Sequence, residues 1–189
     1  MINYKDIKLN FLDNKIVIEE NIDLYVMIDW ETPIMKKHAD IVCQNGGDIL
    51  EIGFGMGIFS NFVNSYNNIN THTIVEIHPQ IIEKVKEWMK DKNNVILIEG
   101  DWYEMQDEIK KRKYDGIFID TFLDKNEKKI KYLLPHIIKD GTIFSYFSPR
   151  MGGQMGYNNL EKYDYVKIRP YNKKNFYKND KALIPWIKF

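Results

Sequence analysis

The sequence contains little of what would point to an exported, membrane-bound or disulfide-linked protein. It holds one cysteine, Cys43, in 189 residues, which excludes an internal disulfide. No apolar run approaches the roughly 20 residues of a membrane-spanning helix. The first residues lack the basic start, apolar stretch and cleavage site of a secretory signal. We therefore expect a soluble, cytoplasmic protein in which Cys43 is a buried thiol without a functional role.

A net charge of either sign is also missing, since 27 Lys and Arg balance 27 Asp and Glu. The charges are unevenly spread, because residues 149–189 contain nine Lys or Arg, three Asp or Glu, and many aromatic residues. Such a segment could bind nucleic acid through phosphate contacts and base stacking. The alternative, which we favour, is that the lysines are solvated side chains on edge strands, where charge opposes aggregation.

The length and composition fit one domain spanning residues 1–189. Apolar residues make up 44% and charged residues 29% of the chain, and a chain of this size can bury roughly 70% of its unfolded surface. We divide the domain into an N-terminal segment at 1–30, a core at 31–148 and basic C-terminal strands at 149–189.

From residue 33 onward, helix-like and strand-like segments alternate, which is typical of a parallel sheet covered by helices on both faces. Thr32 is a candidate helix N-cap and Pro33 fits the first helical position, so a helix is expected from there to Asn45-Gly46-Gly47. We expect strands at 48–52, 71–77, 95–99, 114–120 and 142–147, and helices after the glycine turn to about 66 and at 80–90, 104–112 and 125–138.

Each end of the chain is expected to form its own antiparallel pair of strands. Residues 163–171 and 181–189 read as two paired strands, after a glycine-containing loop at 152–156. Residues 7–10 and 15–18 read as a hairpin. The N-terminal piece could be a lid over the ligand end of the sheet or a simple extension of the sheet.

The segment Asp48-Ile-Leu-Glu-Ile-Gly-Phe-Gly-Met-Gly-Ile-Phe-Ser60 runs from an apolar strand into glycines at every second position. Without Cβ atoms, these glycines let a ligand approach the backbone where the next helix begins. The dinucleotide fingerprint G-x-G-x-x-G needs a glycine at Ile58, so NAD is disfavoured. Glu76 ends the next strand, at about the 20-residue offset where an acid binds ribose hydroxyls. These features indicate an adenosine-containing cofactor bound by the core at 31–148.

Three acidic residues follow strand ends, where ligands of open parallel sheets bind. Glu76 suits the ribose, Asp101 with Trp102 suits the edge and face of adenine, and Asp120 is left to face the substrate. Each acid could instead be a surface residue or a helix N-cap, but their shared location favours a site. Glu31, just before the first core helix, is explained on composition alone as a favourable charge at a helix start.

Three segments resemble a known family: Val26-Met-Ile-Asp-Trp-Glu-Thr-Pro-Ile-Met35, Ile49-Leu-Glu-Ile-Gly-Phe-Gly-Met-Gly57 and Asp115-Gly-Ile-Phe-Ile-Asp-Thr-Phe122. They are similar to guanidinoacetate N-methyltransferase and to the fungal type IV protein arginine methyltransferase, both class I S-adenosylmethionine enzymes. The likeness covers about residues 11–148. It is specific, because the Met-x-x-Trp-Glu-x-Pro element is not part of the general methyltransferase pattern. Glu76-Ile-His-Pro79, Gly100-Asp-Trp102 and Ser145-Tyr-Phe147 look closer to the fungal enzyme.

The resemblance implies a class I methyltransferase fold, in which a Rossmann-like sheet of seven mostly parallel strands carries helices on both faces. It implies S-adenosylmethionine as cofactor and S-adenosylhomocysteine as product, with no metal site. Glu31 and Asp120 match the acids that grip a guanidino group. With the spacing argument above, the expected cofactor contacts are Met27, Met35, Gly53, Phe54, Gly55, Met56, Gly57, Ile58, Phe59, Glu76, Ile77, His78, Gly100, Asp101 and Trp102.

Two carboxylates suit such a reaction, because a guanidinium is a poor nucleophile that stays protonated to above pH ~12. Charge-assisted bonds from Glu31 and Asp120 would hold its positive charge on two nitrogens and aim the third at the methyl group. One of the two acids could then take the departing proton.

The acceptor itself is open at this stage. The segment Pro149–Lys162 is shorter than the helical insert of the family, so the far end of the acceptor can be recognised differently. A small guanidino acid would need a cation, for which Arg150 is a candidate, whereas a protein arginine would need an open groove. The alternatives are methylation of nucleic acid, or a catalytically silent module that keeps the cofactor fold to bind a partner.

Overall fold

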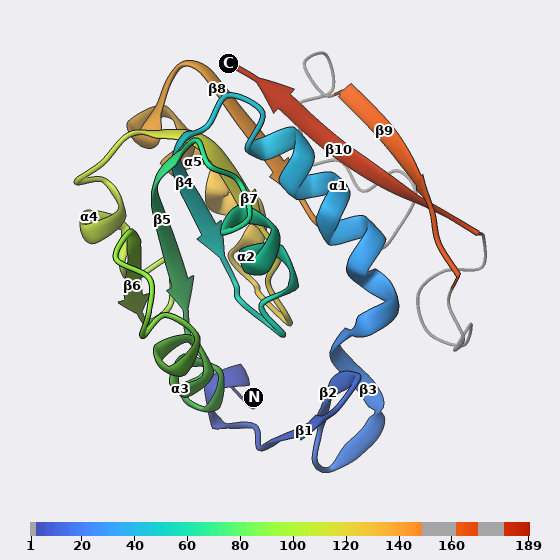
Figure 1. Ribbon diagram of the computed structural model, residues 1–189. Helices are drawn as coiled ribbons and strands as arrows, with labels where there is room; N and C mark the ends of the chain where they lie inside the picture. The colour runs from blue at the N-terminus through green and yellow to red at the C-terminus, as the bar shows by residue number, and fades with distance from the viewer. Residues whose placement is uncertain (1–2, 149–161, 170–179) are drawn as a thin grey trace.

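The computed structural model describes residues 3–148, 162–169 and 180–189, and within them the core is a mostly parallel sheet (Figure 1). Its strands are β4 (Gly47–Ile52), β5 (Ile69–Glu76), β6 (Val95–Glu99), β7 (Tyr114–Ile119), β8 (Ile138–Tyr146), β9 (Lys162–Lys167) and β10 (Lys181–Lys188). Their order is β6-β5-β4-β7-β8-β10-β9. Neighbours from β6 to β8 are parallel, and β10 runs antiparallel to β8 and β9. The expected sheet and its antiparallel C-terminal pair are confirmed.

Helices cover both faces of this sheet, as the alternating pattern predicts. On one face lie α1 (Thr32–Val42), α2 (Ile58–Val63) and α3 (Pro79–Trp88), and on the other lie α4 (Gln106–Ile109) and α5 (Ile130–Ile137). Successive strand side chains point to opposite faces. Accordingly, Ile49 packs with Phe59 of α2, while its neighbour Leu50 packs with Ile109 of α4 and Leu133 of α5.

Some helix boundaries differ from the expectation. Helix α2 ends at Val63 rather than near 66, and α4 has four residues where nine were expected. The expected helix at 125–138 divides into a 3₁₀ turn, η3 (Glu127–Lys129), and α5. Pro135 lies inside α5 and cannot donate a backbone hydrogen bond, and the helix ends two residues later, where β8 begins.

Thr32 is the first residue of α1 and not its N-cap, which corrects the sequence-based assignment. Its hydroxyl donates to the carbonyl of Asp29 at 2.5 Å, across the short turn η2 (Asp29–Glu31). Glu31 occupies the cap position, and Pro33 lies in the first turn as expected. The side chain of Glu31 is therefore placed by the joint between η2 and α1.

The N-terminal segment forms a separate three-stranded antiparallel sheet. Strands β1 (Leu9–Leu12) and β2 (Lys15–Ile18) make the expected hairpin, and β2 also pairs with β3 (Asn21–Ile28). Sequence reasoning missed β3, although it is as long as β5. Strand β3 leads directly into η2 and α1, so it brings the N-terminal sheet to the carboxyl ends of the core strands (Figure 1).

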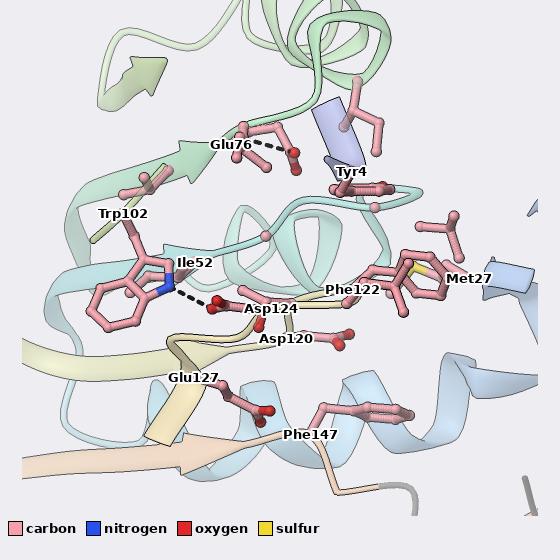
Figure 2. Close-up of a pocket in the computed structure, with 18 of the residues that line it drawn as sticks. Tyr4, Met27, Ile52, Glu76, Trp102, Asp120, Phe122, Asp124, Glu127 and Phe147 are labelled. Atoms are coloured by element: carbon pink, nitrogen blue, oxygen red, sulfur yellow. Dashed lines mark hydrogen bonds between the residues drawn. The ribbon is translucent and has the colours of Figure 1, made fainter. Parts of the chain in front are cut away.

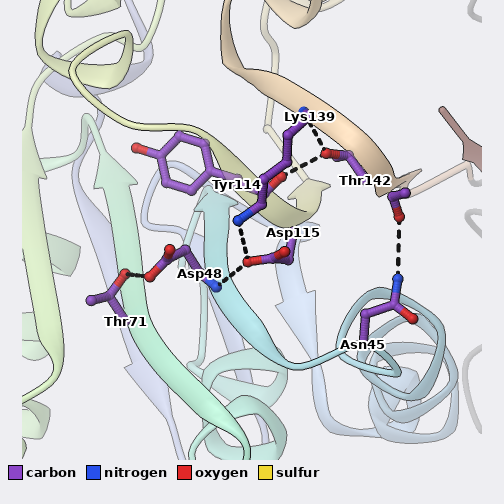
Figure 3. Close-up of polar contacts among 8 residues, drawn as sticks. Asn45, Asp48, Thr71, Tyr114, Asp115, Lys139 and Thr142 are labelled. Carbon is purple, nitrogen blue, oxygen red and sulfur yellow. Dashed lines mark hydrogen bonds and ion pairs between the residues drawn. The ribbon is translucent and has the colours of Figure 1, made fainter.

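A polar network ties the core strands together at their amino ends (Figure 3). Asp115 accepts from the amide of Asp48 at 2.7 Å and pairs with Lys139 at 2.8 Å. Asp48 in turn accepts from the hydroxyl of Thr71, and the hydroxyl of Thr142 donates to the carbonyl of Tyr114, both at 2.7 Å. These contacts join β4, β5, β7 and β8 at the end of the sheet opposite the expected ligand site.

Cys43 is buried, with 2% of its surface exposed, and burial raises the pKa of its thiol to about 12. The expected buried thiol is confirmed. In the part of the chain that the structure describes, no helix has the length and apolar character needed to cross a membrane. Arg150 and the glycine loop at 152–156 lie outside the described residues.

Candidate active site

A cavity of about 840 Å³ opens where β4, β5 and β7 end (Figure 2). This volume lies in the range of pockets that hold cofactors and small substrates. Ten of the residues singled out from the sequence line it: Met27, Glu31, Gly53, Gly55, Glu76, Ile77, Gly100, Asp101, Trp102 and Asp120. The cavity thus gathers residues from β3, η2 and the ends of several core strands.

Two glycines of the turn after β4 are required by close packing. Gly53 has φ of +91°, and a Cβ there would lie 1.9 Å from the carbonyl oxygen of Asp120. Gly55 has φ of +55°, and a Cβ there would lie 2.8 Å from the sulfur of Met27. Both values of φ are unfavourable for residues with side chains. The glycines therefore let the turn approach both β3 and the end of β7, which brings Asp120 and Met27 to the same cavity.

The amides of this turn mostly donate within the protein. The N–H of Phe54 donates to Glu76 at 2.9 Å, that of Met56 to the sulfur of Met27 at 3.1 Å, and that of Gly57 to the carbonyl of Phe54 at 2.9 Å. These three amides are therefore used within the protein, whereas the missing side chains of Gly53 and Gly55 leave room beside the turn.

Glu76 is buried at the end of β5, with 4% of its surface exposed. Its carboxylate accepts N–H bonds from Ile77 and Phe54 at 2.9 Å and from His78 at 2.8 Å. Burial raises the pKa of Glu76, and these three bonds oppose the rise. A carboxylate has about four acceptor positions, so Glu76 is fixed by the backbone and can still accept from a ligand hydroxyl.

Glu31 lies just before α1 and Asp120 just after β7, far apart in the sequence, but both line the same cavity. Glu31 is 7% exposed and accepts from the amide of Ile28 at 3.1 Å. Burial raises its pKa to about 7, against a small opposing effect of that amide. The amide of Asp120 donates to the carbonyl of Ile52 at 2.9 Å, but its carboxylate makes no hydrogen bond or ion pair with another described residue. The pKa of its carboxyl is raised well above the ordinary value, mainly by burial and next by the negative charges of Glu31 and Glu127.

Trp102 and Asp101 lie beside each other at the end of β6. The indole N–H of Trp102 donates to Asp124 at 2.7 Å (Figure 2). Asp124 also accepts from the amide of Asn126 at 2.6 Å. Asp101 accepts from the amide of Tyr103 at 2.8 Å, and burial raises its pKa. Asp124 therefore fixes the ring of Trp102 and the loop after β7 against each other.

The remaining expected cofactor contacts do not line the cavity: Met35, Phe54, Met56, Gly57, Ile58, Phe59 and His78. Met35 and Phe59 are buried in the core beneath the glycine turn, where Phe59 stacks on Phe118. The ring of Phe54 packs edge-on against Trp88, and His78 caps α3. Their roles toward a cofactor stay predictions.

Several lining residues had not been singled out from the sequence. Tyr4, Asp124 and Glu127 are among them (Figure 2). Asp124 and Glu127 follow β7 closely, and the rule that sites lie after strand ends could have included them. Tyr4 has no comparable signal, because the path of the N-terminal segment depends on tertiary contacts.

The cavity wall is strongly acidic. Among the residues that the structure describes, six acids line it, Glu31, Glu76, Asp101, Asp120, Asp124 and Glu127, beside one lysine, Lys125. Burial and mutual repulsion raise the pKa of the Asp120 carboxyl, and burial followed by the charge of Asp124 raises that of Glu127. A positively charged ligand would relieve this repulsion, so the wall is suited to cationic ligands.

Comparison with known proteins gives related sequences and folds. The model of the guanidinoacetate N-methyltransferase family matches residues 4–183. Protein arginine N-methyltransferase 2 of Kluyveromyces lactis is 35% identical over 156 residues, which are 77% of this chain and 38% of that protein. The protein of the same name from Saccharomyces cerevisiae is 31% identical over 77% of this chain and 37% of its own length. This chain thus spans less than two fifths of these relatives.

Among solved structures, the O-methyltransferase from Bacillus cereus in complex with SAH matches with a TM-score of 0.58 at 13% identity. The match covers 84% of this chain and 80% of that chain. The fold is therefore that of class I methyltransferases, as expected.

Proposed function

The chain belongs to the guanidinoacetate N-methyltransferase family, and on that basis we propose that it transfers a methyl group from S-adenosylmethionine to a nitrogen of a guanidino group. The observation that carries the proposal is the placement of Glu31 and Asp120 on one acidic cavity beside Glu76 and the glycine turn. The acceptor is either a small guanidino compound or an arginine of a protein. The names of the two relatives above support the second.

The residues present fit the proposed cofactor. Glu76 is held by three backbone N–H groups and can accept from a ribose hydroxyl. Trp102 and Asp101 offer an aromatic side chain and a carboxylate for the adenine, and Gly55 presents no side chain to the cavity that it lines. When bound there, S-adenosylmethionine supplies an electrophilic methyl group on a positively charged sulfur.

Glu31 and Asp120 supply the acceptor side of the chemistry. Both carboxylates have raised pKa values, because burial disfavours their charges and, at Asp120, the charge of Glu31 adds to this. A guanidinium between them replaces repulsion by attraction, so both carboxylates ionise and orient the acceptor. One of them then accepts the proton that the methylated nitrogen releases, and the pKa of Glu31, about 7, is well matched to that task.

A methyl-transfer assay with labelled S-adenosylmethionine tests the proposal. The acceptors are guanidinoacetate, free arginine and an arginine-containing peptide, with the matching lysine peptide as a control. We expect labelled methyl groups on at least one guanidino compound and none on lysine. Transfer only to another class of acceptor, such as RNA, would reject the guanidino assignment. Binding of the cofactor without transfer to any acceptor would favour a silent binding module.

A further inference from the structure

Tyr4 reaches the active-site cavity from the N-terminal segment, in the turn η1 (Tyr4–Asp6). Its ring lies 4.9 Å from the ring of His78 and 5.3 Å from that of Phe122, measured between centroids. His78 begins α3 and Phe122 follows β7. Tyr4 therefore bridges two walls of the cavity that the core sheet alone leaves apart (Figure 2).

The segment that carries Tyr4 is fastened to the start of α3. The ring nitrogen Nδ1 of His78 accepts from the amide of Gln80 at 3.2 Å, so Nε2 carries the proton and donates to the carbonyl of Ile7 at 2.8 Å. The side chain of Gln80 makes two bonds to the backbone of Leu9, at 2.8 and 3.1 Å. These contacts position Tyr4 with a defined geometry rather than leaving it on a loose end.

Tyr4 lines the same cavity as the carboxylates of Glu76 and Asp120, and its ring packs near His78 and Phe122, which stand two positions after these acids. Burial, then the charges of Glu76 and Asp120, raise the pKa of Tyr4 strongly, so the hydroxyl stays protonated. No described residue is a hydrogen-bond partner of this hydroxyl. A polar group without a partner, in a cavity that it shares with two acids, is therefore available to a ligand.

The proposed roles of Glu76 and Asp120 define which part of the cofactor lies between these two acids. If Glu76 binds the ribose and Asp120 binds the acceptor, the sulfur that joins the ribose to the transferred methyl group must lie between these carboxylates. Tyr4 shares the cavity with both. We propose that the phenol oxygen of Tyr4 contacts the positively charged sulfur centre and favours S-adenosylmethionine over its neutral product, S-adenosylhomocysteine. This inference rests on the proposed function.

The physical basis is the difference in charge between substrate and product cofactor. The oxygen of a neutral phenol carries partial negative charge, which attracts a nearby sulfonium more strongly inside a protein than in bulk water. The thioether of the product has no such charge. The same contact that holds the substrate cofactor would thus be weaker once the methyl group has left.

The test compares the affinities of both forms of the cofactor by calorimetry. Tyr4→Phe keeps the ring contacts with His78 and Phe122 and removes only the oxygen. We expect its affinity for S-adenosylmethionine to fall about tenfold, as for the loss of a polar contact to a charged group. Its affinity for S-adenosylhomocysteine should fall less than about threefold. Tyr132→Phe is the matched control, because Tyr132 on α5 is 66% exposed, and it should change neither value.

The outcomes separate this inference from the proposed function. Equal losses of affinity for both forms, or no loss in Tyr4→Phe, would overturn the role of the oxygen even if methyl transfer is observed. Failure of the unmodified chain to bind either form would overturn both proposals. If the unmodified chain binds the cofactor but methylates no guanidine, a selective loss in Tyr4→Phe still supports the inference. A second variant, Tyr4→Leu, also removes the ring and should lower the affinity for both forms of the cofactor. Melting temperatures show that each variant is folded.

Discussion

Replacing Glu31 by glutamine should stabilise the ligand-free protein while removing an acceptor-binding charge. In the folded state the pKa of Glu31 is about 7, against an ordinary value of 4.5. A raised pKa means that the folded state holds the proton more tightly than the unfolded state, so stability falls as the pH rises from about 4.5 to about 7. Because a tenfold change in proton affinity corresponds to about 1.4 kcal/mol, the loss above pH 7 is about 3 kcal/mol.

The variant Glu31→Gln keeps the shape of the side chain and cannot ionise. At pH 8 we expect it to be more stable than the unmodified protein by up to about 3 kcal/mol, and at pH 5 by less than about 1 kcal/mol. For a chain of this size, the difference at pH 8 corresponds to a melting temperature higher by roughly 6–12 °C.

The assay is thermal unfolding of the ligand-free protein at both pH values, with Glu104→Gln as control. Glu104 is exposed, and its substitution should change the stability by less than about 0.5 kcal/mol at either pH. A change in melting temperature that is the same at pH 5 and pH 8, or a lower stability at pH 8, would refute the reasoning. In that case ionisation of Glu31 would not be what lowers the stability of the folded protein at pH 8.

Three further predictions concern the acids and the turn. Asp120→Asn should lower kcat/KM for the acceptor by roughly 10–100-fold, the loss expected for a hydrogen bond to a charged group, with less than a threefold change in cofactor affinity by calorimetry. Gly53→Ala should lower the melting temperature far more than Gly141→Ala, because a Cβ at Gly53 would lie 1.9 Å from the Asp120 carbonyl, whereas Gly141, at φ of +85°, has nothing within 4 Å. Comparable losses in the two glycine variants would contradict the packing argument. The kcat/KM for the acceptor should rise with pH through about 7, as Glu31 loses its proton; a profile that is flat from pH 5 to 8 would exclude ionised Glu31 from acceptor binding.

The core of the fold could be predicted because its signals are local. The strand from Asp48 to Ile52 and its glycine turn are defined by residue types at short spacing, and the structure has them within one residue. Strand β3 was missed although its residues are suited to a strand, because its pairing with β2 is a tertiary choice. Helix α4 is shorter than the charged pattern at 104–112 indicated, since such a pattern on the surface does not define where a helix ends.

In the candidate site too, residues with a local sequence signal were predicted and those placed by tertiary contacts were not. Glu76 and Asp120 were found from their places after strands, and both line the cavity. Glu31 was ambiguous from composition, and the structure shows why: it occupies the cap position of α1 and also lines the cavity. Only the resemblance of its neighbouring residues to a family pointed to the second property. Tyr4 could not be found from the sequence, because its position results from bonds between Ile7, Leu9 and the start of α3.

The network of Asp48, Thr71, Asp115, Lys139 and Thr142 separates mechanical support from chemistry within one sheet. The acids that repel one another lie at the opposite ends of the same strands, so their repulsion acts far from the contacts that hold the strands in register. A change in the loops around the cavity would therefore leave these contacts in place.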